Sequence, residues 1–543
     1  MAGVMYGAKV TGNHGGDGAM RVAPERAMGS GDDTAIAGIM PVRLEGVHAE
    51  DGADASSASG AVLLAAVACR DTICLDRAVH GLRRKWPELS AASSAAPWQQ
   101  RALIVAAGAG AVVAAIAPDI GRHIAALALA VPFLMIVIIR IVAIHYLLRP
   151  DAKATAAVPS AGSMVRRACP LPTYSVLVPL YRETAVAANI VAALAALDYP
   201  HDKLEVIFLT EADDAATRQA LSNAAMTPTM RIVVVPAGEP RTKPRALSFG
   251  LQLAVGEFIC IFDAEDVPDP AQLRVAAEAF ARDDGRLACV QARLDIYNPK
   301  ASLWTRQFTI EYAALFEAVL PALGRLGLPL PLGGTSNHFR ATHLKDAGGW
   351  DPFNVTEDAD LGFRFARKGY RVAMIDTTTW EEAPETARIW LGQRTRWLKG
   401  WMQTYLVHTR HPVRLWRDLG PRRFIGFQVT LGGMVLSALV HPWAYVSILA
   451  AVMTDTRDWS PSANGLVALC GFNLIVGYGA GIALAVLALR RRAISGLAPS
   501  TMWIPFYWLA ISFAAYRAVW DFIRRPYYWE KTPHGAPNVT LPV

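Results

Sequence analysis

Three clusters of polar side chains near the middle of this 543-residue sequence have residue types and spacing that suit chemistry. The first cluster is Asp263-Ala264-Glu265-Asp266, which directly follows a short apolar run. Carboxylates two residues apart can bind one hard cation, and Mg²⁺ or Mn²⁺ prefers oxygen ligands of this kind. The same residues would also suit a solvated acidic turn, because Pro268 and Pro270 follow them. Alone, this cluster leaves both interpretations open.

The second cluster is Thr356-Glu357-Asp358, which precedes the amphipathic run Leu361–Arg367. A threonine followed by acids is typical of a helix start, where negative charge is favourable. A carboxylate in this position can also serve as a general base. The two interpretations are compatible, because a helix start can also present a catalytic group.

The third cluster is Gln393-Arg394-Thr395-Arg396-Trp397, within a helix-like stretch at Ala387–Val407 that is dense in tryptophan and arginine. This composition favours an amphipathic helix on a membrane surface. It also suits ligand binding, because arginine binds diphosphates and tryptophan packs under sugar rings.

The elements that must position these clusters alternate between strand and helix. Short β-branched apolar runs predict strands at Ser175–Leu180, Leu204–Leu209, Arg231–Val235 and Glu257–Phe262. Helical spacing between them predicts helices at Ala185–Leu197, Ala215–Ala225 and Ala246–Ala254. Such alternation predicts an α/β layer with a mostly parallel sheet, whose ligands bind at the carboxyl ends of the strands. Two of the strands end in acidic residues, at Glu211 and Asp263.

The composition places part of the chain in lipid. It is 53% hydrophobic and only 18% charged, whereas a soluble domain is about a quarter charged. The apolar excess is concentrated in the runs Ala102–Pro118, Ile124–Ile139, Phe424–Thr454, Gly465–Leu489 and Ala493–Tyr516. Their lengths predict five membrane spans, or six if the long third run is split at its His-Pro pair.

Basic residues near the spans indicate the orientation. They gather before the first span, at Arg83-Arg84-Lys85 and Arg101, and between Arg410 and Arg423 before the third. The positive-inside rule therefore places the middle domain in the cytoplasm. The net charge of +7 is explained by these flanking arginines, so we expect no nucleic-acid partner. The side of the membrane on which the C-terminus lies is left open.

The order and spacing of the three clusters resemble membrane-embedded family-2 glycosyltransferases of the cellulose synthase type. The resemblance covers Tyr174–Gln403 and the flanking spans, and bacterial processive exopolysaccharide or glucan synthases are the most similar members. It implies a GT-A-type α/β nucleotide-sugar glycosyltransferase domain inserted between transmembrane helices. The family's DxD, TED and QxxRW motifs fall on Asp263-Ala264-Glu265, Thr356-Glu357-Asp358 and Gln393–Trp397.

The resemblance also implies roles for single residues. Asp358 would be the catalytic base, and Asp263 and Glu265 would hold Mg²⁺ or Mn²⁺. Several residues depart from the family pattern. Arg182 replaces an asparagine, Glu211 replaces the second aspartate of an Asp-Asp-Gly motif, and Glu265 replaces the second aspartate of DxD. The residues expected to bind the nucleotide sugar are Glu183, Glu211, Lys243, Asp263 and Arg396, and those expected to bind the acceptor are Glu357, Gln393 and Trp397.

The expected organisation follows from the spans and the resemblance. It comprises a disordered segment at 1–60, a helical cytoplasmic segment at 61–100, two transmembrane helices at 101–148, a cytoplasmic GT-A domain at 170–408 that ends in an amphipathic interface helix, about three transmembrane helices at 424–523 and a short tail at 524–543.

The expected function is that of an inverting hexosyltransferase, processive and coupled to export, in the bacterial inner membrane. It would transfer sugar from a UDP-sugar to a growing β-linked polysaccharide. The alternative is a non-processive enzyme that glycosylates a lipid acceptor. The expected partners are thus the nucleotide sugar, a glycan or lipid acceptor and membrane lipids, while the sequence identifies no export partner.

Overall fold

The computed structural model describes residues 58–93, 95–149, 170–453, 461–526 and 528. Most of the expected N-terminal disordered segment and of the C-terminal tail lies outside these residues. The chain divides into two compact units, Met1–Leu63 and Leu64–Val543. Helix α1 (Ala58–Lys85) begins in the first unit, and every other element below belongs to the second.

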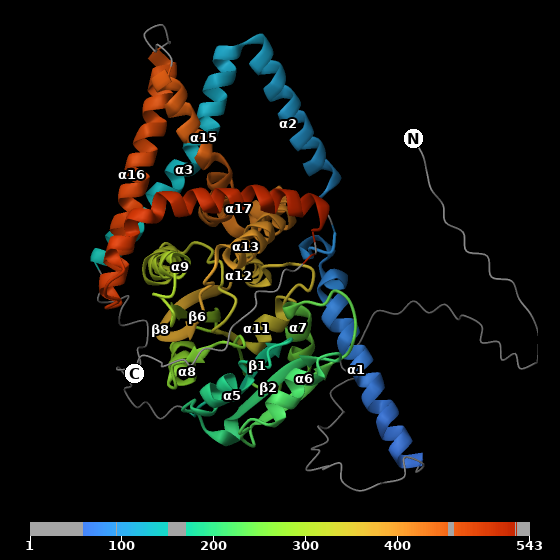
Figure 1. The fold of residues 1–543 in the computed structure, drawn as a ribbon. Helices are drawn as coiled ribbons and strands as arrows, with labels where there is room; N and C mark the ends of the chain where they lie inside the picture. Colours follow the sequence, from blue (N-terminus) through green and yellow to red (C-terminus); the bar gives the residue numbers. More distant parts are fainter. Residues whose placement is uncertain (1–57, 94, 150–169, 454–460, 527, 529–543) are drawn as a thin grey trace, which may run out of the picture. The chain divides into compact units, whose positions relative to one another are not determined.

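The second unit contains an eight-stranded sheet in the order β3-β2-β1-β4-β7-β6-β8-β5 (Figure 1). The four predicted strands are confirmed as neighbouring parallel strands, with register running from Tyr174 opposite Leu204 to Leu180 opposite Thr210 in the first pair. Their bounds are β1 (Tyr174–Leu180), β2 (Leu204–Glu211), β3 (Met230–Val235) and β4 (Phe258–Ile261).

The other half of the sheet makes it mixed rather than mostly parallel. Strand β7 (Asn337–Arg340) inserts antiparallel between β4 and β6 (Leu287–Ile296). Strand β8 (Arg371–Glu381) runs parallel to β6, and the short β5 (Val267–Pro268) pairs antiparallel with β8. Strand β7 brings the turn before it, at residues 333–336, beside the end of β4, because Ser336 donates its backbone N–H to Ile261 at 2.8 Å.

Helices pack on both faces of the sheet around two apolar cores. One face packs against α5 (Ala187–Ala195), α6 (Ala215–Ser222) and α8 (Gln272–Ala281). The other packs against α7 (Lys243–Leu253), α11 (Ala341–Asp346) and α12 (Glu357–Arg367). Between β6 and β7 the chain forms α9 (Leu303–Ala314), a π-helical turn (Leu315–Val319) and α10 (Leu320–Arg325), and the 3₁₀ turns are Pro87–Leu89, His201–Lys203 and Ala498–Trp503.

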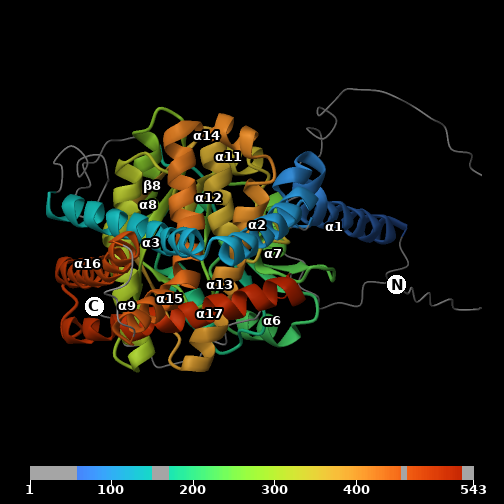
Figure 2. The same ribbon diagram turned by 90° about the horizontal axis from the view of Figure 1, so that it is seen from above.

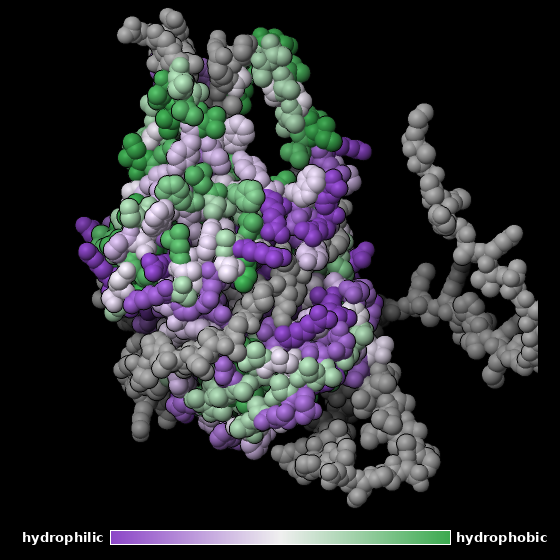
Figure 3. All heavy atoms as spheres, viewed as in Figure 1, coloured by the Kyte–Doolittle hydropathy of each residue, from purple (hydrophilic) through white to green (hydrophobic). Residues whose placement is uncertain are grey.

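Four helical segments among the described residues are long and apolar enough to cross a membrane: Pro97–Ile116, Ala130–Leu148, Pro412–Met453 and Asn464–Arg491. They belong to α2 (Pro97–Ile116), α3 (Pro118–Leu148), α14 (Pro412–Phe427) with α15 (Met434–Met453), and α16 (Pro461–Arg491). A π-helical segment, Gln428–Gly433, joins α14 to α15, and α15 continues through Pro442, so the third run is not split at its His-Pro pair. The backbone leaves helical geometry at Gly420 (φ 69°), before that run begins. Hydrophobic residues gather on α2 and on the neighbouring ends of α3 and α16 (Figure 3).

The last expected span is occupied mainly by α17 (Ile504–Arg524), which is not among the four segments. Figures 1 and 2 show α17 running beside α13 (Ala387–His408), the helix that carries the third polar cluster. The two helices are joined by the Trp390 Nε1–H, which donates to the Tyr507 hydroxyl at 3.0 Å. Helix α17 therefore supports α13 on the side away from α12.

Candidate active site

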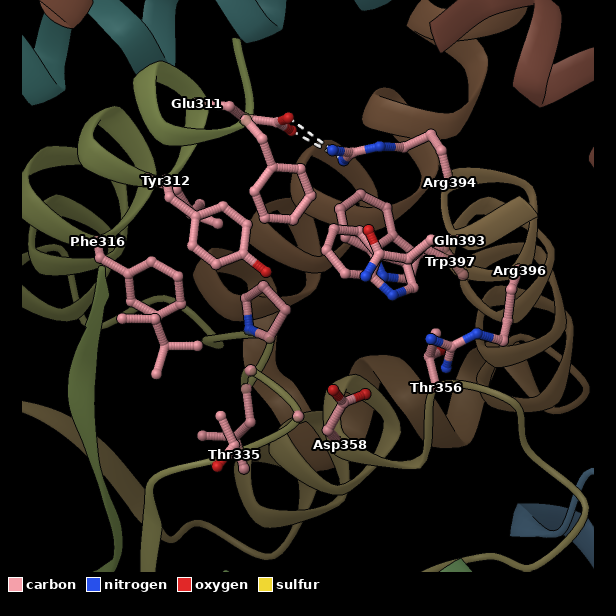
Figure 4. Close-up of a pocket in the computed structure, with 18 of the residues that line it drawn as sticks. Glu311, Tyr312, Phe316, Thr335, Thr356, Asp358, Gln393, Arg394, Arg396 and Trp397 are labelled. Atoms are coloured by element: carbon pink, nitrogen blue, oxygen red, sulfur yellow. Dashed lines mark hydrogen bonds and ion pairs between the residues drawn. The ribbon is translucent and has the colours of Figure 1, made fainter. Parts of the chain in front are cut away.

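One cavity of about 480 Å³ brings the three clusters together. All ten residues that the sequence predicted for the site line it: Glu183, Glu211, Lys243, Asp263, Glu265, Glu357, Asp358, Gln393, Arg396 and Trp397. Figure 4 shows Asp358 facing Gln393, Arg396 and Trp397 across this space. The cavity also extends to residues of α3, α15 and α17, so one space joins the sheet edge to the apolar helices.

The TED residues lie at the start of α12. Thr356 occupies the N-cap position without a side-chain cap bond, and Glu357, Asp358 and Asp360 form the acidic first turn. Burial raises the pKa of Asp358, although the Ala359 N–H and Lys243 oppose the shift. Burial and the neighbouring Asp358 raise the pKa of Glu357 to about 7. A buried carboxylate with a raised pKa is a better proton acceptor than an exposed one.

The residues after β4 are held by Asp266. Its carboxylate accepts from the backbone N–H of Asp263 at 2.6 Å and from the Thr335 hydroxyl. Burial, followed by the charges of Asp263 and Glu265, raises the pKa of Asp266. Asp266 is thus a buried positioning group, and Asp263 and Glu265 are left to line the cavity.

The carboxylates of Asp263 and Glu265 fit a divalent cation by their chemistry. Glu381 and Glu382 line the same cavity, and a buried oxygen of Glu381 has no hydrogen-bond partner. Within the described part of the chain, no three ligand-type side chains are close enough to enclose an ion. The residues therefore fit a cation that two carboxylates hold and whose other positions are completed by phosphate or water, as is common for Mg²⁺.

Lys243, at the first position of α7, links the acidic cluster that begins at Asp263 to the TED cluster. Its ammonium forms an ion pair with Asp263 and donates to the carbonyl of Gly334 at 2.7 Å. Gly334 lies against Asp358, since a Cβ there would lie 3.3 Å from an Asp358 carboxylate oxygen. Burial alone would lower the pKa of Lys243, but Asp263 and Glu357 together raise it. Lys243 is therefore a permanent cation at the centre of the site.

The end of β2 carries Glu211, whose carboxylate is engaged by Arg245. The Arg245 side chain is fully buried, and it also donates to the carbonyl of Gly238 at 2.6 Å. Burial raises the pKa of Glu211, while Arg245 opposes the shift. Arg182, which replaces the family's asparagine, adopts φ 56° and donates its backbone N–H to Asp214 at 2.5 Å.

The QxxRW residues project from α13 into the cavity (Figure 4). The Oε1 atom of Gln393 is buried and has no hydrogen-bond partner in the structure, so it is available to a ligand. Trp397 lies among rings, with its centroid 5.9 Å from that of Phe308 and 6.4 Å from that of Tyr312. Burial lowers the pKa of Arg396, and Glu357 and Asp358 oppose the shift.

Several residues that the sequence did not single out support the site. Arg394 pairs with both carboxylate oxygens of Glu311, at 2.9 and 2.6 Å, and the Tyr507 hydroxyl donates to the same carboxylate at 2.7 Å. This cluster joins α13 to α9 and α17. The only sequence signal for it was the position of Arg394 inside the QxxRW motif.

A second supporting cluster locks α12 to α13. The buried Asp360 accepts from Arg364 Nε at 2.7 Å and lies 3.0 Å from His408 Nε2. Burial tends to raise the pKa of Asp360, but Arg364 lowers it overall. The Asp360 position was visible in the sequence as the second acid after TED, but its partner His408 was not.

The architecture is that of a GT-A-like glycosyltransferase fold, with an α/β sheet whose strand ends present carboxylates to a ligand cavity. Residues 172–400, which are less than half of the chain, match the family described as "Glycosyltransferase like family 2". This match agrees with the family-2 glycosyltransferase class that the motifs predicted.

Individual relatives share this region. The chain is 28% identical over 316 residues to a beta-monoglucosyldiacylglycerol synthase of Nostoc, which covers 58% of this chain and 65% of that protein. It is 27% identical over 257 residues to a probable glucomannan 4-beta-mannosyltransferase of Arabidopsis thaliana. This alignment covers 46% of this chain and 44% of that protein. A mannosyltransferase structure from Pyrobaculum calidifontis aligns at 17% identity and a TM-score of 0.42. This alignment covers 74% of this chain and 99% of that structure's chain. The chain spans between half and two thirds of the length of the first curated relatives it matches.

Proposed function

We propose that this protein transfers a sugar from a UDP-sugar to an acceptor hydroxyl with inversion at the anomeric carbon. The observation that carries the proposal is the meeting of Asp358, Lys243 and Arg396 in one buried cavity at the sheet edge. The acceptor oxygen attacks the anomeric carbon, and Asp358 accepts its proton. Proton transfer of this kind contributes about 10²–10⁴-fold to a rate. An α-linked donor then gives a β-linked product.

The leaving UDP develops negative charge that the site must stabilise. Lys243 and Arg396 are two cations at the cavity wall, and both are buried enough for their charge to act strongly. Asp263 and Glu265 would hold Mg²⁺ or Mn²⁺, which when bound neutralises phosphate charge. Glu183 and Glu211 would bind the nucleoside, with Arg245 fixing the Glu211 carboxylate.

We propose a growing β-linked glycan as the acceptor, extended processively and exported, with the catalytic domain on the cytoplasmic side of the bacterial inner membrane. The aromatic lining supports this proposal, because Phe308, Tyr312 and Trp397 present ring faces suited to sugars. Glu357, Gln393 and Trp397 would contact the acceptor.

A membrane lipid is the second candidate acceptor. It is supported by the extension of the same cavity to Phe133 and Ile136 of α3 and Met434 of α15, which lie in candidate membrane spans. The similarity to a glucosyldiacylglycerol synthase agrees with this candidate but does not distinguish it from the first.

The test is a panel of nucleotide sugars given to purified protein with Mg²⁺ or Mn²⁺, with nucleotide release and product linkage as readouts. We expect UDP release from one sugar nucleotide and a β-linkage in the product. Asp358→Asn should bind donor and lose nearly all turnover. Normal turnover by that variant would refute the assignment. Insoluble polymer and organic-extractable glycolipid distinguish the two acceptors.

A further inference from the structure

Helix α3 carries one arginine, Arg140, inside the apolar segment Ala130–Leu148. An ionised side chain in such a segment is costly unless it is paired or serves a ligand, and it marks a functional site by default. The side chain of Arg140 does not extend along the helix to a charged partner. Instead it lines the same cavity as Asp358 and Trp397.

The guanidinium of Arg140 has an unusual environment. Its Nη1 atom is buried without a hydrogen-bond partner, and no carboxylate of the described residues forms an ion pair with Arg140. The guanidinium packs over Trp508, whose ring centroid lies 4.0 Å from Cζ. A cation–π contact of this kind recovers only part of the free energy that a guanidinium loses on leaving water.

The charge of Glu311 acts on Arg140, but this carboxylate is already paired with another arginine. Glu311 accepts from Arg394 at 2.9 and 2.6 Å and from Tyr507 at 2.7 Å. Another polar group at this end, His441, contacts the Tyr478 hydroxyl at 2.6 Å and Ser512 Oγ at 3.4 Å. Arg140 therefore brings to the membrane end of the cavity a positive charge that no ion pair among the described residues neutralises, and its Nη1 is a donor without a partner.

We propose that Arg140 forms a phosphate subsite at the membrane end of the cavity, and that a phosphate-bearing lipid is the acceptor. Guanidinium binds phosphate through paired N–H donors. The apolar wall beside Arg140, formed by Phe133, Ile136 and Met434, suits the start of an acyl chain. A lipid held in this way directs its headgroup hydroxyl toward the Asp358 end. This inference rests on the proposed function, and it names the chemistry of the second candidate acceptor.

Three lipid probes in phosphate-free and sugar-free polyoxyethylene detergent micelles test the subsite. Phosphatidylglycerol has a phosphate and free hydroxyls, phosphatidylcholine has a phosphate without an acceptor hydroxyl, and diacylglycerol has a hydroxyl without a phosphate. We expect Arg140→Gln to weaken binding of both phospholipids at least about tenfold, from the loss of charge-assisted hydrogen bonds. Binding of diacylglycerol should not change. Native mass spectrometry reads the bound lipid directly.

Two variants control the experiment. Arg140→Lys keeps the charge and should retain most of the phospholipid binding, which separates loss of charge from loss of fold. Arg325→Gln removes an arginine that packs on Tyr146 of α3, 5.4 Å from the ring centroid, outside the cavity, and it should behave like the unmodified protein. The proposal would be overturned if Arg140→Gln weakened the binding of all three lipids equally, or did not weaken the binding of any of them.

Donor turnover separates this proposal from the function on which it rests. With UDP-sugar present, the unmodified protein should glycosylate phosphatidylglycerol, and Arg140→Gln should raise the KM for phosphatidylglycerol. Selective phospholipid binding without glycosylation would support the phosphate subsite and overturn the lipid's role as acceptor. Absence of any nucleotide release from the unmodified protein would refute the proposed function, while the lipid-binding comparison would still decide the subsite.

Discussion

The contact between α13 and the TED turn depends on Gly400. An added Cβ there would lie 2.4 Å from Thr356 Oγ1, 2.5 Å from Cγ2 and 2.8 Å from Cβ. Thr356 is buried and β-branched, so its side chain cannot rotate away freely. Gly400→Ala must therefore push α13 away from the start of α12. Overpacking of this kind costs about 1–3 kcal/mol of folding free energy.

The same displacement should impair catalysis, because Thr356 is two residues from Asp358 and Gly400 is three residues from Trp397. A misplacement of about 1 Å in a catalytic arrangement can cost on the order of 10²-fold in rate. We expect Gly400→Ala to lower kcat by about 10–100-fold, with a smaller change in the KM for the donor.

Steady-state nucleotide release and the thermal unfolding midpoint measure the two effects. Gly479→Ala is the matched control, because it adds the same methyl group to a helix where a Cβ would meet nothing within 4 Å. Adding Thr356→Ala to Gly400→Ala removes two of the three clashing atoms and should recover part of the stability. Wild-type kcat and unfolding midpoint in Gly400→Ala would refute the reasoning.

Three further predictions follow from the site. The Asp358 carboxylate must be ionised to accept a proton, and burial raises its pKa. We therefore expect kcat to fall, as the pH decreases, at pH values above the ordinary pKa range of aspartate. A kcat that stays constant down to that pH range would contradict this. Arg245→Met should destabilise the protein by about 3–5 kcal/mol, because it leaves the buried Glu211 carboxylate without its partner; denaturant unfolding measures the loss, and Arg245→Met with Glu211→Gln should restore part of it. Chelation should abolish nucleotide release and added Mn²⁺ should restore it, whereas full activity in chelator would show that Lys243 and Arg396 suffice.

The sequence predicted much of the domain because its signals are local. Strands β1 to β4 were visible as β-branched runs, and α12 and α13 as amphipathic stretches. Strands β5 to β8 were not predicted. Strand β7 is only four residues long and pairs between segments that are distant in the chain. Sheet order depends on which segments meet in space, and hydrophobic periodicity does not encode that order.

By itself, the sequence predicted the class of the domain, ten residues that line one cavity and the apolar segments beside it. Only the tertiary structure decided how these residues are held: Arg245 on Glu211, Glu311 and Tyr507 on Arg394, and His408 on Asp360. It also placed α17 along α13 and Arg140 in the catalytic cavity. The physical reason is that a buried charge needs a partner close in space, and partners more than 30 residues apart are brought together only by packing.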